Sequence, residues 1–507
     1  MSVNGQSSGS GRPNVVKTSL EKDLSKLSRM EEVAQNLSRR MLAPGLGVLF
    51  LTVVGGFASI QVGAQPNAVF IMIAAVFGGY MALNIGANDV ANNVGPAVGA
   101  RALTLTGALI IAALFESAGA LIAGGDVVST ISKGIIDPSM VPDSQTFIWA
   151  MMAALLSSAL WVNLATYIGA PVSTTHSVVG GVMGAGIAAV GFGAVNWPTM
   201  GAIAASWVIS PILGGVIAAA FLAFIKTFII YQDDKIAAAR RWVPVLIAIM
   251  ASAFSCYLMI KGLKKVWKPD ATTIIAIGVA IFFASVAILR PLIRKQSKGM
   301  ENRNQSLRTL FHIPLICSAA LLSFAHGAND VANAVGPLAA ILHSAQSGDI
   351  AAKVNIPVWV MLIGAIGICL GLFLYGPRLI KMVGEQITKM NPMRAFCVAL
   401  SAAITVIVAS WLGLPVSSTH IAVGGVFGVG FFREYYTRHS KRRRAYVMKH
   451  AGKTKNWAED RPRREELRRR KLVRRSHFST IIAAWVVTVP AAALLSAVVF
   501  YGLSQLR

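Results

Sequence analysis

The chain has 507 residues, of which 55% are hydrophobic and only 13% are charged, and its formal net charge at pH 7 is +26. A soluble domain carries about 25% charged residues, so this composition excludes a soluble globular protein and indicates a chain that crosses a membrane many times. Backbone groups in lipid must be hydrogen-bonded within the protein, and the alternation typical of a membrane β-barrel is absent, so the apolar segments are predicted to be helices.

The first 41 residues are polar and carry charges of both signs, and thirteen apolar blocks follow them. Residues 1–41 lack the basic and then apolar order of a signal peptide, so we expect a disordered or interfacial tail. Most of the blocks reach the roughly 20 residues that a helical span requires. The blocks lie roughly at 42–64, 68–96, 103–124, 145–168, 170–191, 197–231, 242–262, 272–290, 311–338, 356–376, 394–412, 413–432 and 477–504.

Two motifs occur twice along the chain. GANDVANNVGP at 86–96 recurs as GANDVANAVGP at 327–337, and GAPVSTTHSVVGG at 169–181 recurs as GLPVSSTHIAVGG at 413–425. The offsets of 241 and 244 residues agree so closely that one ancestral unit was duplicated whole. The expected segments are a tail at 1–41, a first transmembrane repeat at 42–231, a linker with an extra apolar segment at 232–271, the core of a second repeat at 272–432, a basic cytoplasmic loop at 433–476 and the last segment of the second repeat at 477–507.

The extra apolar segment predicts that the second repeat enters the bilayer inverted, because it makes the number of preceding crossings odd. With the N-terminus inside, the basic stretches at 226–241, 290–308, 378–394 and 433–476 all fall on the cytoplasmic side, and only 261–268 falls outside. Inverted repeats are typical of secondary transporters, whose site lies at the midplane. We therefore predict an all-α polytopic membrane protein with two inverted-topology repeats, broken helices and re-entrant hairpins, built from about 11–13 apolar segments.

The most basic segment, 433–476, holds eighteen Lys and Arg against five Asp and Glu. Such a run beside membrane spans indicates a cytoplasmic loop that touches anionic lipid rather than nucleic acid.

The first repeated motif places one aspartate in each half, Asp89 and Asp330. A carboxylate inside a membrane helix costs roughly 2.5–3.5 kcal/mol, and such groups mark ion or substrate pathways. Asn and Gly weaken a helix and Pro96 and Pro337 are expected to break it, which predicts a discontinuous helix whose carbonyls join the side-chain oxygens around a small hard cation. The structural alternative is that these side chains only bond helices together.

The second motif places three consecutive hydroxyl residues after a proline: 173–175 after Pro171, and 417–419 after Pro415. The prolines suit a first helical turn, and a helix N-terminus with neutral donors is a seat for an anion. The alternative is ordinary packing of small residues. Neither motif contains Lys or Arg, so cations between the carboxylates and the anion would be needed, and each ligand would raise the affinity for the other.

Four further ionisable residues lie in apolar blocks. Glu116 has no carboxylate counterpart in the second repeat, and an ion-path role is expected for it. His176, His420 and His326 accompany the motifs, where a structural hydrogen bond and a proton relay are both open.

At these residues the chain resembles the inorganic phosphate transporter (PiT) family, whose hallmark is the duplicated Gly-Ala-Asn-Asp-Val-Ala-Asn signature. The resemblance implies inverted repeats and phosphate uptake coupled to Na+ or H+, with bacterial members taking up a neutral metal-phosphate complex, and sulfate as the cargo of some relatives. It implies no cofactor beyond the coupling ion and a location in a cell membrane, here a bacterial inner membrane. The residues expected to hold the coupling cation are Asp89, Asp330, Asn88, Asn329 and Glu116. Those expected to hold the anion are Ser173, Thr174, Thr175, Ser417, Ser418, Thr419, Asn92 and Asn333.

The expected function is therefore a secondary active symporter that imports inorganic phosphate, with phosphate and the lipid bilayer as partners. The alternatives are a sulfate or other oxyanion symporter, a passive channel, a membrane enzyme, and a receptor or scaffold. No His-Glu-x-x-His, Gly-x-Ser-x-Gly or Walker motif occurs, which argues against an enzyme or a primary pump. The sequence leaves open whether the chain acts as a monomer or a homodimer.

Overall fold

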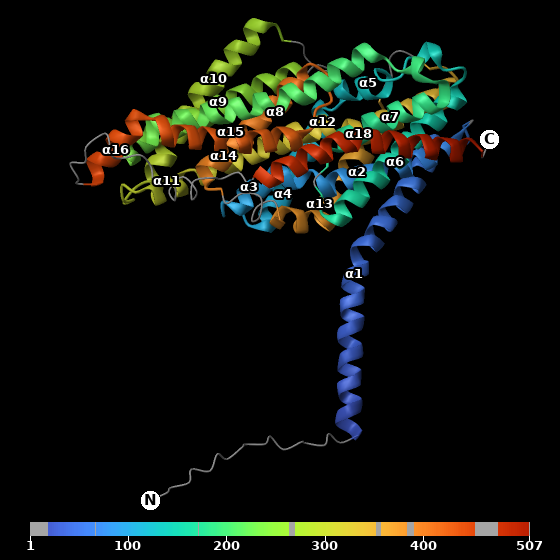
Figure 1. Ribbon diagram of the computed structural model, residues 1–507, viewed down its shortest axis with the longest axis horizontal. Coiled ribbons are helices and arrows are strands. Elements are labelled where there is room, and N and C mark those ends of the chain that lie inside the picture. The colour runs from blue at the N-terminus through green and yellow to red at the C-terminus, as the bar shows by residue number, and fades with distance from the viewer. Residues whose placement is uncertain are drawn as a thin grey trace, which may run out of the picture. The chain divides into compact units, whose positions relative to one another are not determined.

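A computed structural model describes residues 19–65, 67–170, 172–262, 269–350, 356–382, 390–451 and 475–505 (Figure 1). The chain divides into two compact units, residues 1–49 and 50–507. Residues 19–41, where the sequence predicts a polar tail, are helical and form the first part of α1 (Ser19–Val62). These residues are therefore helical rather than disordered, and an interfacial position of the tail stays a prediction. Residues 1–18 lie outside the described residues.

The described residues form helices and no strands, apart from a single bridge between Ile136 and Val195. The all-α prediction is therefore confirmed. The helices after α1 are α2 (Ala68–Asn88), α3 (Val90–Gly99), α4 (Leu105–Ala123), α5 (Gly125–Lys133), η1 (Pro138–Met140), α6 (Ser144–Ile168), α7 (Thr174–Val190), η2 (Phe192–Ala194), α8 (Trp197–Ile225), η3 (Lys226–Ile230), α9 (Lys235–Lys261), α10 (Ala271–Gln296), α11 (Asn304–Leu310), α12 (His312–Ser347), α13 (Val358–Met382), α14 (Pro392–Trp411), α15 (Ser418–His439), α16 (Lys441–Ala451) and α18 (Arg475–Ser504).

Eleven helices of the described chain are long and apolar enough to cross a membrane, so the chain is a multi-pass membrane protein. The two remaining apolar blocks, 170–191 and 413–432, are those that begin with the hydroxyl motif. The first forms the 17-residue α7, and the second forms α15, whose last turns carry charged side chains. Each follows its predecessor through a glycine with positive φ, Gly169 (78°) or Gly413 (69°), which closes a helical hairpin. The re-entrant character of these hairpins stays a prediction.

The predicted repeats are interwoven rather than packed as separate bodies. The motif helix α2 packs against α13, and the matching α12 packs against α4. The contacts are backbone to backbone: a Cβ on Gly86 would overlap the carbonyl oxygen of Ile368, and a Cβ on Gly327 would overlap that of Glu116. Both predicted halves therefore share one interior, and glycine is required where their helices meet.

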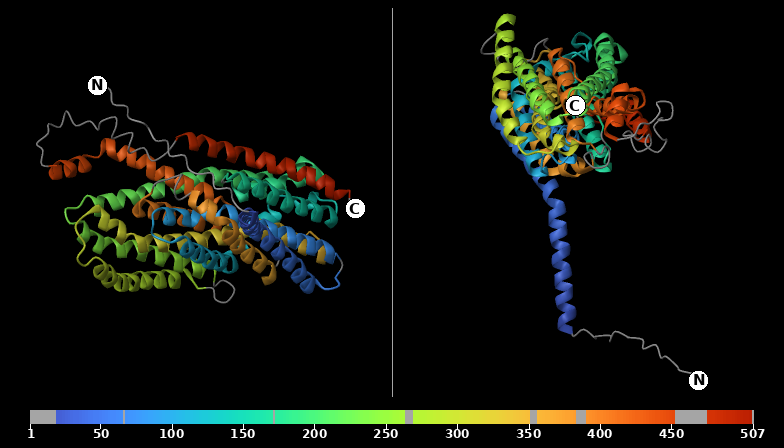
Figure 2. Two further views of the ribbon diagram at one scale, coloured as in Figure 1. Left: turned by 90° about the horizontal axis from the view of Figure 1, so that it is seen from below. Right: turned by 90° about the vertical axis from the view of Figure 1, so that its left-hand side faces the viewer.

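The helical hairpin of each predicted repeat likewise packs against a helix of the other repeat. The last helix of the first predicted repeat, α8, packs on α15, and the last helix of the chain, α18, packs along α6 and α7 (Figures 1 and 2). Gly180 of α7 lies against Val489 of α18, and the equivalent Gly424 of α15 lies against Pro211 of α8. These matched contacts are what a duplicated unit produces, while the inverted orientation of the repeats stays a prediction.

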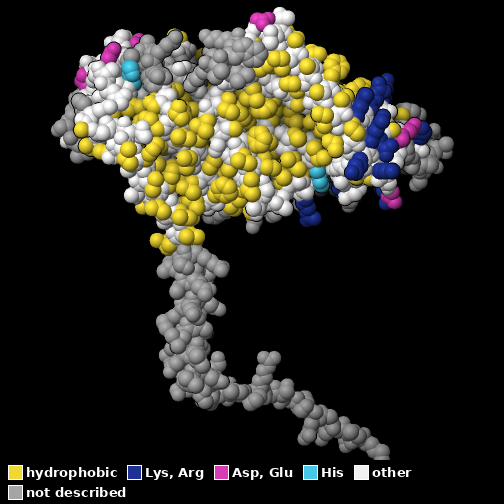
Figure 3. All heavy atoms as spheres, turned by 180° about the vertical axis from the view of Figure 1, so that it is seen from behind, with side chains coloured by type: hydrophobic (Ala, Val, Ile, Leu, Met, Phe, Trp, Pro, Cys, Tyr) yellow, Lys and Arg dark blue, Asp and Glu magenta, His cyan; other side chains and the backbone are white. Residues whose placement is uncertain are grey.

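The basic stretches gather at one end of residues 50–507, beside a broad band of hydrophobic side chains (Figure 3). Arg240 Nη2 donates to the carbonyl of Ser297 at 3.1 Å, and Lys449 Nζ lies 2.9 Å from Asp233 Oδ2. These bonds join 226–241, 290–308 and 433–451, and Arg394 of the remaining stretch, 378–394, lines a cavity together with Arg308 of 290–308. The described parts of these stretches thus lie at one end of residues 50–507, and their cytoplasmic location stays a prediction.

The helix breaks are smaller than predicted. Only Asp89 interrupts the first motif, and its φ of −87° and ψ of −34° remain in the right-handed helical region. The second motif lies inside the continuous α12, so the predicted break there is wrong. Every residue of α12 from Ser318 to Leu342 is buried, and this packing outweighs the weak helix propensity of Asn, Gly and Pro337. Pro415 precedes α15 instead of entering its first turn, and Pro171 lies outside the described residues.

Candidate functional site

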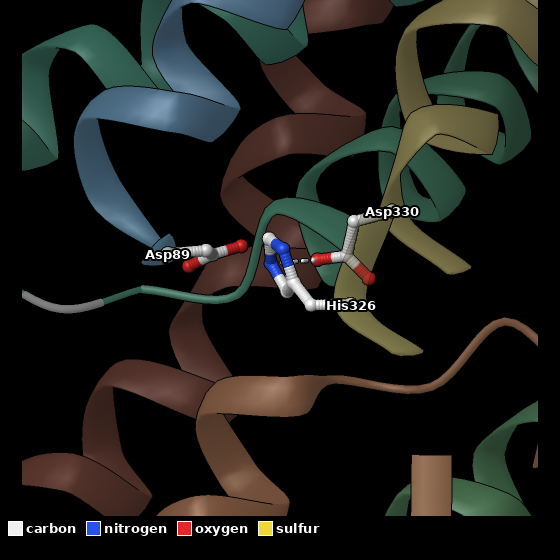
Figure 4. A group of neighbouring side chains, drawn as sticks. All are labelled: Asp89, His326 and Asp330. Carbon is white, nitrogen blue, oxygen red and sulfur yellow. Dashed lines mark ion pairs between the residues drawn. The ribbon is translucent and has the colours of Figure 1, made fainter. Parts of the chain in front are cut away.

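Asp89 and Asp330 lie together in the protein interior with His326 between them (Figure 4). One ligand atom from each of the three lies within 4.8 Å of the others. Asp89 is 2% exposed, Asp330 is 1% exposed and His326 is fully buried. The duplicated motif thus brings its two aspartates into one centre, and two carboxylates with an imidazole are a set that could hold a metal ion.

Asp89 accepts hydrogen bonds from one threonine of each hydroxyl triplet. Thr174 Oγ1 donates to Asp89 Oδ2 at 2.6 Å, and Thr419 Oγ1 donates to Asp89 Oδ1 at 3.0 Å. Asn92 Nδ2 in turn donates to Thr419 Oγ1 at 2.8 Å. The carboxylate and the hydroxyl triplets, which the sequence assigns to two different ligands, are therefore in direct contact.

The N-termini of α7 and α15 meet at this centre. Ser173 caps α7 by accepting from the His176 amide at 3.1 Å, and Ser417 caps α15 by accepting from the His420 amide at 3.3 Å. Thr175 Oγ1 bridges the two ends by donating to the carbonyl of Val416 at 3.0 Å. Two helix N-termini that face one point concentrate positive potential there, which suits an anion.

The hydroxyl groups of the two triplets make different hydrogen bonds in this arrangement. Ser173 and Ser417 are helix caps, which the sequence analysis did not separate from ligands. Ser418 Oγ is buried and has no hydrogen-bond partner among the described residues. Asn333 Nδ2 donates to Thr175 Oγ1 at 3.1 Å, and its own Oδ1 has no hydrogen-bond partner in the described chain.

Asn88 and Asn329 make the same contacts in the two halves. Asn88 Nδ2 donates to Thr166 Oγ1 at 2.9 Å, and Asn329 Nδ2 donates to Ser410 Oγ at 3.0 Å. Each amide nitrogen also lies near a carbonyl of the hairpin turn, Ala170 at 3.4 Å or Leu414 at 3.3 Å. Their amide nitrogens thus fasten the motif helices to the hairpins. Asn88 Oδ1 has no hydrogen-bond partner among the described residues, whereas Asn329 Oδ1 accepts from the Val416 amide at 3.4 Å.

Three buried carboxylate and amide oxygens of the residues expected at the site have no hydrogen-bond partner in the described chain. They are Asp330 Oδ1, Asn333 Oδ1 and Asn88 Oδ1. Asp330 and Asn333 are three residues apart on α12 and so share a face. Leaving such atoms unpaired costs free energy, and a hard cation that prefers oxygen ligands would satisfy them.

His326 links the centre to Glu116. Its Nδ1 lies 2.7 Å from Glu116 Oε2 and its Nε2 lies 3.0 Å from Asp330 Oδ2. Asn93 Nδ2 holds the other oxygen of Glu116 at 2.7 Å. A neutral imidazole has a single N–H, so a ring placed between two carboxyl groups requires a second proton on the ring or on one carboxyl. Glu116 therefore reaches the aspartates through His326 and not directly.

Asn93 contacts Glu116 at the site, and the sequence analysis gave it no role. Its counterpart in the second motif is Ala334, and Glu116 likewise has no acidic counterpart. These two residues, which have no equivalent in the second repeat, are hydrogen-bonded to each other: Asn93 Nδ2 donates to Glu116 Oε1 at 2.7 Å. The mismatch between the two motif copies was the available signal.

Comparison with known proteins finds similar sequences and a similar structure. A family model described as "Phosphate transporter family" matches residues 85–496. A protein of Helicobacter pylori strain J99 named "Putative phosphate permease" is 45% identical over 525 residues, covering 95% of this chain and 98% of its own. A Pyrococcus abyssi protein of the same description is 36% identical over 433 residues, covering 85% and 97%. The solved structure of "The sodium-dependent phosphate transporter" is similar with a TM-score of 0.74 and 34% identity, covering 87% of this chain and all of that chain.

Proposed function

Since the chain belongs to the phosphate transporter family, we propose that it is a secondary active symporter that imports inorganic phosphate together with a cation. The observation that carries this proposal is the contact between the buried Asp89 and the two hydroxyl triplets at the ends of α7 and α15. A cation seat and an anion seat that touch give each ligand a reason to improve the binding of the other.

The coupling cation in this proposal is Na+, held by the oxygens of Asp89, Asp330, Asn88, Asn329 and Asn333. Two buried carboxylates repel each other, and a cation between them removes that repulsion. The similar solved structure is titled as sodium-dependent, which supports this choice. Coupling to H+ is the second candidate, because Glu116, His326 and Asp330 form a bonded chain that can hold a proton at the same place.

The anion seat is formed by neutral donors at the two helix N-termini, chiefly Ser418, Thr174 and Thr419, while Thr175 donates its own hydrogen to the Val416 carbonyl. Each threonine hydroxyl has a single hydrogen, and in this structure Thr174 and Thr419 donate theirs to Asp89. A cation on Asp89 would accept the hydroxyl lone pairs as ligands and free both hydrogens for a phosphate oxygen. This exchange is the proposed physical link between cation binding and anion binding.

The cargo could instead be sulfate or a neutral metal-phosphate complex, since the donors at the helix ends are uncharged. Competition of sulfate with labelled phosphate separates the first case, and the effect of chelating divalent ions separates the second. A passive channel is distinguished by uphill accumulation, which requires an ion gradient and which an ionophore abolishes.

The test is uptake of radiolabelled phosphate into proteoliposomes with sodium and pH gradients imposed separately. Asp89→Asn and Asp330→Asn are expected to abolish sodium-driven uptake while the protein still inserts. Asp137→Asn is the matched control, because Asp137 lies outside the aspartate centre and its carboxylate accepts hydrogen bonds from the amide and the hydroxyl of nearby Ser139. Normal uptake by both site variants would refute the proposal. Uptake driven by the pH gradient alone would show that the coupling ion is H+ and not Na+.

A further inference from the structure

A cavity of about 720 Å³ opens at the basic end of the molecule, away from the aspartate centre. The end of α3 forms one wall, and α11 with the first turns of α12 and α14 forms the others. Its volume falls in the range of about 300–1,000 Å³ that is usual for sites of small organic ligands. The cavity therefore offers more room than a single inorganic phosphate needs.

The charged side chains that line this cavity are all basic. Arg101, Arg308 and Arg394 line it together with His312, and no Asp or Glu is among its described lining residues. Arg308 and Arg433 both repel Arg394 electrostatically. Like charges gathered around a concave surface cost free energy unless an anion lies among them.

Arg394 is the innermost of these side chains. Its Nε donates to Asn391 Oδ1 at 3.0 Å, while its Nη1 is buried and has no hydrogen-bond partner in the described part of the chain. A buried guanidinium nitrogen without an acceptor is costly, and phosphate oxygens are the acceptors that fit the planar fork of arginine best.

Arg101 is held in place by an unusual backbone. Its φ is +58°, a region that residues with a Cβ seldom adopt, and its amide donates to the carbonyl of Val98 at 2.9 Å. This turn ends α3 and puts Arg101 on the wall of the cavity, which residues of α11 and α14 also line. The cavity is thus lined by arginines from both predicted repeats.

We propose that this cavity binds an anion that carries two or more phosphate groups, held by Arg101 of the first predicted repeat and by Arg308 and Arg394 of the second. The three guanidinium groups and the size of the cavity favour several linked phosphates over one. The ligand would be either a soluble polyphosphate compound of the cytoplasm or the headgroup of a lipid with two phosphates, because both present the same chemistry.

A bound polyphosphate anion also has a consequence for transport, which rests on the proposed function. The anion joins α3 to α11 and α14, and alternating access requires the predicted repeats to move against each other. A ligand that binds one arrangement better than the other shifts the population toward it. Occupation of the cavity is therefore expected to slow uptake.

The test measures binding to the purified full-length protein by calorimetry, without divalent ions. The probes are tripolyphosphate, inorganic phosphate, and nanodiscs with or without cardiolipin. Tripolyphosphate is expected to bind, and Arg394→Gln and Arg308→Gln are each expected to weaken binding at least tenfold. Arg303→Gln is the matched control, because Arg303 is exposed, pairs with Glu301, and lies outside the cavity lining. Arg308 is exposed, so its variant remains informative if Arg394→Gln does not fold.

Tripolyphosphate binding that both variants weaken would establish a soluble ligand. If the protein binds cardiolipin nanodiscs but not tripolyphosphate, and both variants lose the nanodisc binding, the ligand is the lipid headgroup. Binding that the variants leave unchanged, no binding of either probe, or equal binding of inorganic phosphate and tripolyphosphate would overturn the proposal. The same titration on Asp89→Asn separates this result from the proposed function, because the cavity is expected to keep its ligand when transport is lost.

Discussion

The contact between Glu116 and His326 allows the charge of the Glu116 side chain to be tested separately from its shape. Glu116→Gln keeps the shape of the side chain, and Glu116→Ala removes it. In the first variant the new amide can donate to His326 Nδ1, its oxygen can still accept from Asn93, and the neutral imidazole can donate from Nε2 to Asp330. In the second variant His326 and Asn93 both lose a buried partner.

The two variants should therefore differ in stability. Removing one partner of a buried ion pair costs about 3–5 kcal/mol, and the alanine variant is expected to lose that much. The glutamine variant keeps every hydrogen bond and is expected to lose about 1 kcal/mol, the net value of one ordinary hydrogen bond. Thermal unfolding in detergent, followed by tryptophan fluorescence, measures the difference.

The glutamine variant should also bind sodium more tightly. A positive ring 3.0 Å from Asp330 competes with a cation for that carboxylate, and the variant favours the uncharged ring. Two unit charges 4 Å apart interact by about 4 kcal/mol at an effective dielectric constant of about 20. A third of this value, about 1.4 kcal/mol, is a tenfold change in an equilibrium constant, so the sodium concentration for half-maximal phosphate uptake is expected to fall about tenfold. Equal destabilisation of the two variants, or a higher sodium requirement in the glutamine variant, would refute the reasoning.

Three further predictions concern the helix contact, the hydroxyls and the basic helix. Gly327→Ala is expected to prevent correct folding, since its Cβ would overlap the Glu116 carbonyl, whereas Gly201→Ala, which meets nothing within 4 Å, should behave as wild type in size-exclusion chromatography. Thr419→Val should weaken phosphate binding at least tenfold in calorimetry, while Thr419→Ser should retain it; equal loss in both would show that the methyl group and not the hydroxyl matters. Lys441→Gln with Arg442→Gln should leave uptake within twofold of wild type, and a large fall in turnover of well-inserted protein would show a functional role for α16.

The parts of the fold that the sequence predicted are those set by the membrane and by duplication. Hydropathy and the requirement for internal backbone hydrogen bonds were enough to predict helices. The repeated motif was enough to predict that Asp89 and Asp330 lie close together, because equivalent positions of two matched units meet at their common interface.

The parts that the sequence did not predict depend on tertiary contacts. The break at Pro337 was expected from local propensity, but the packing around α12 keeps the helix continuous. Glu116 and His326 are 210 residues apart, and no spacing rule connects them. Asn88 and Asn329 were predicted to help hold the cation, and the motif gave no sign that their amide nitrogens bond to Thr166 and Ser410 of the hairpins.

The most direct test of the account measures phosphate affinity by calorimetry on the purified protein at several sodium concentrations, in wild type, Asp89→Asn and Asp330→Asn. Reciprocal coupling predicts that sodium tightens phosphate binding at least tenfold in the wild type, and that this dependence disappears in both variants. The same sodium dependence in all three proteins would contradict the claim that the paired aspartates hold the cation beside the anion.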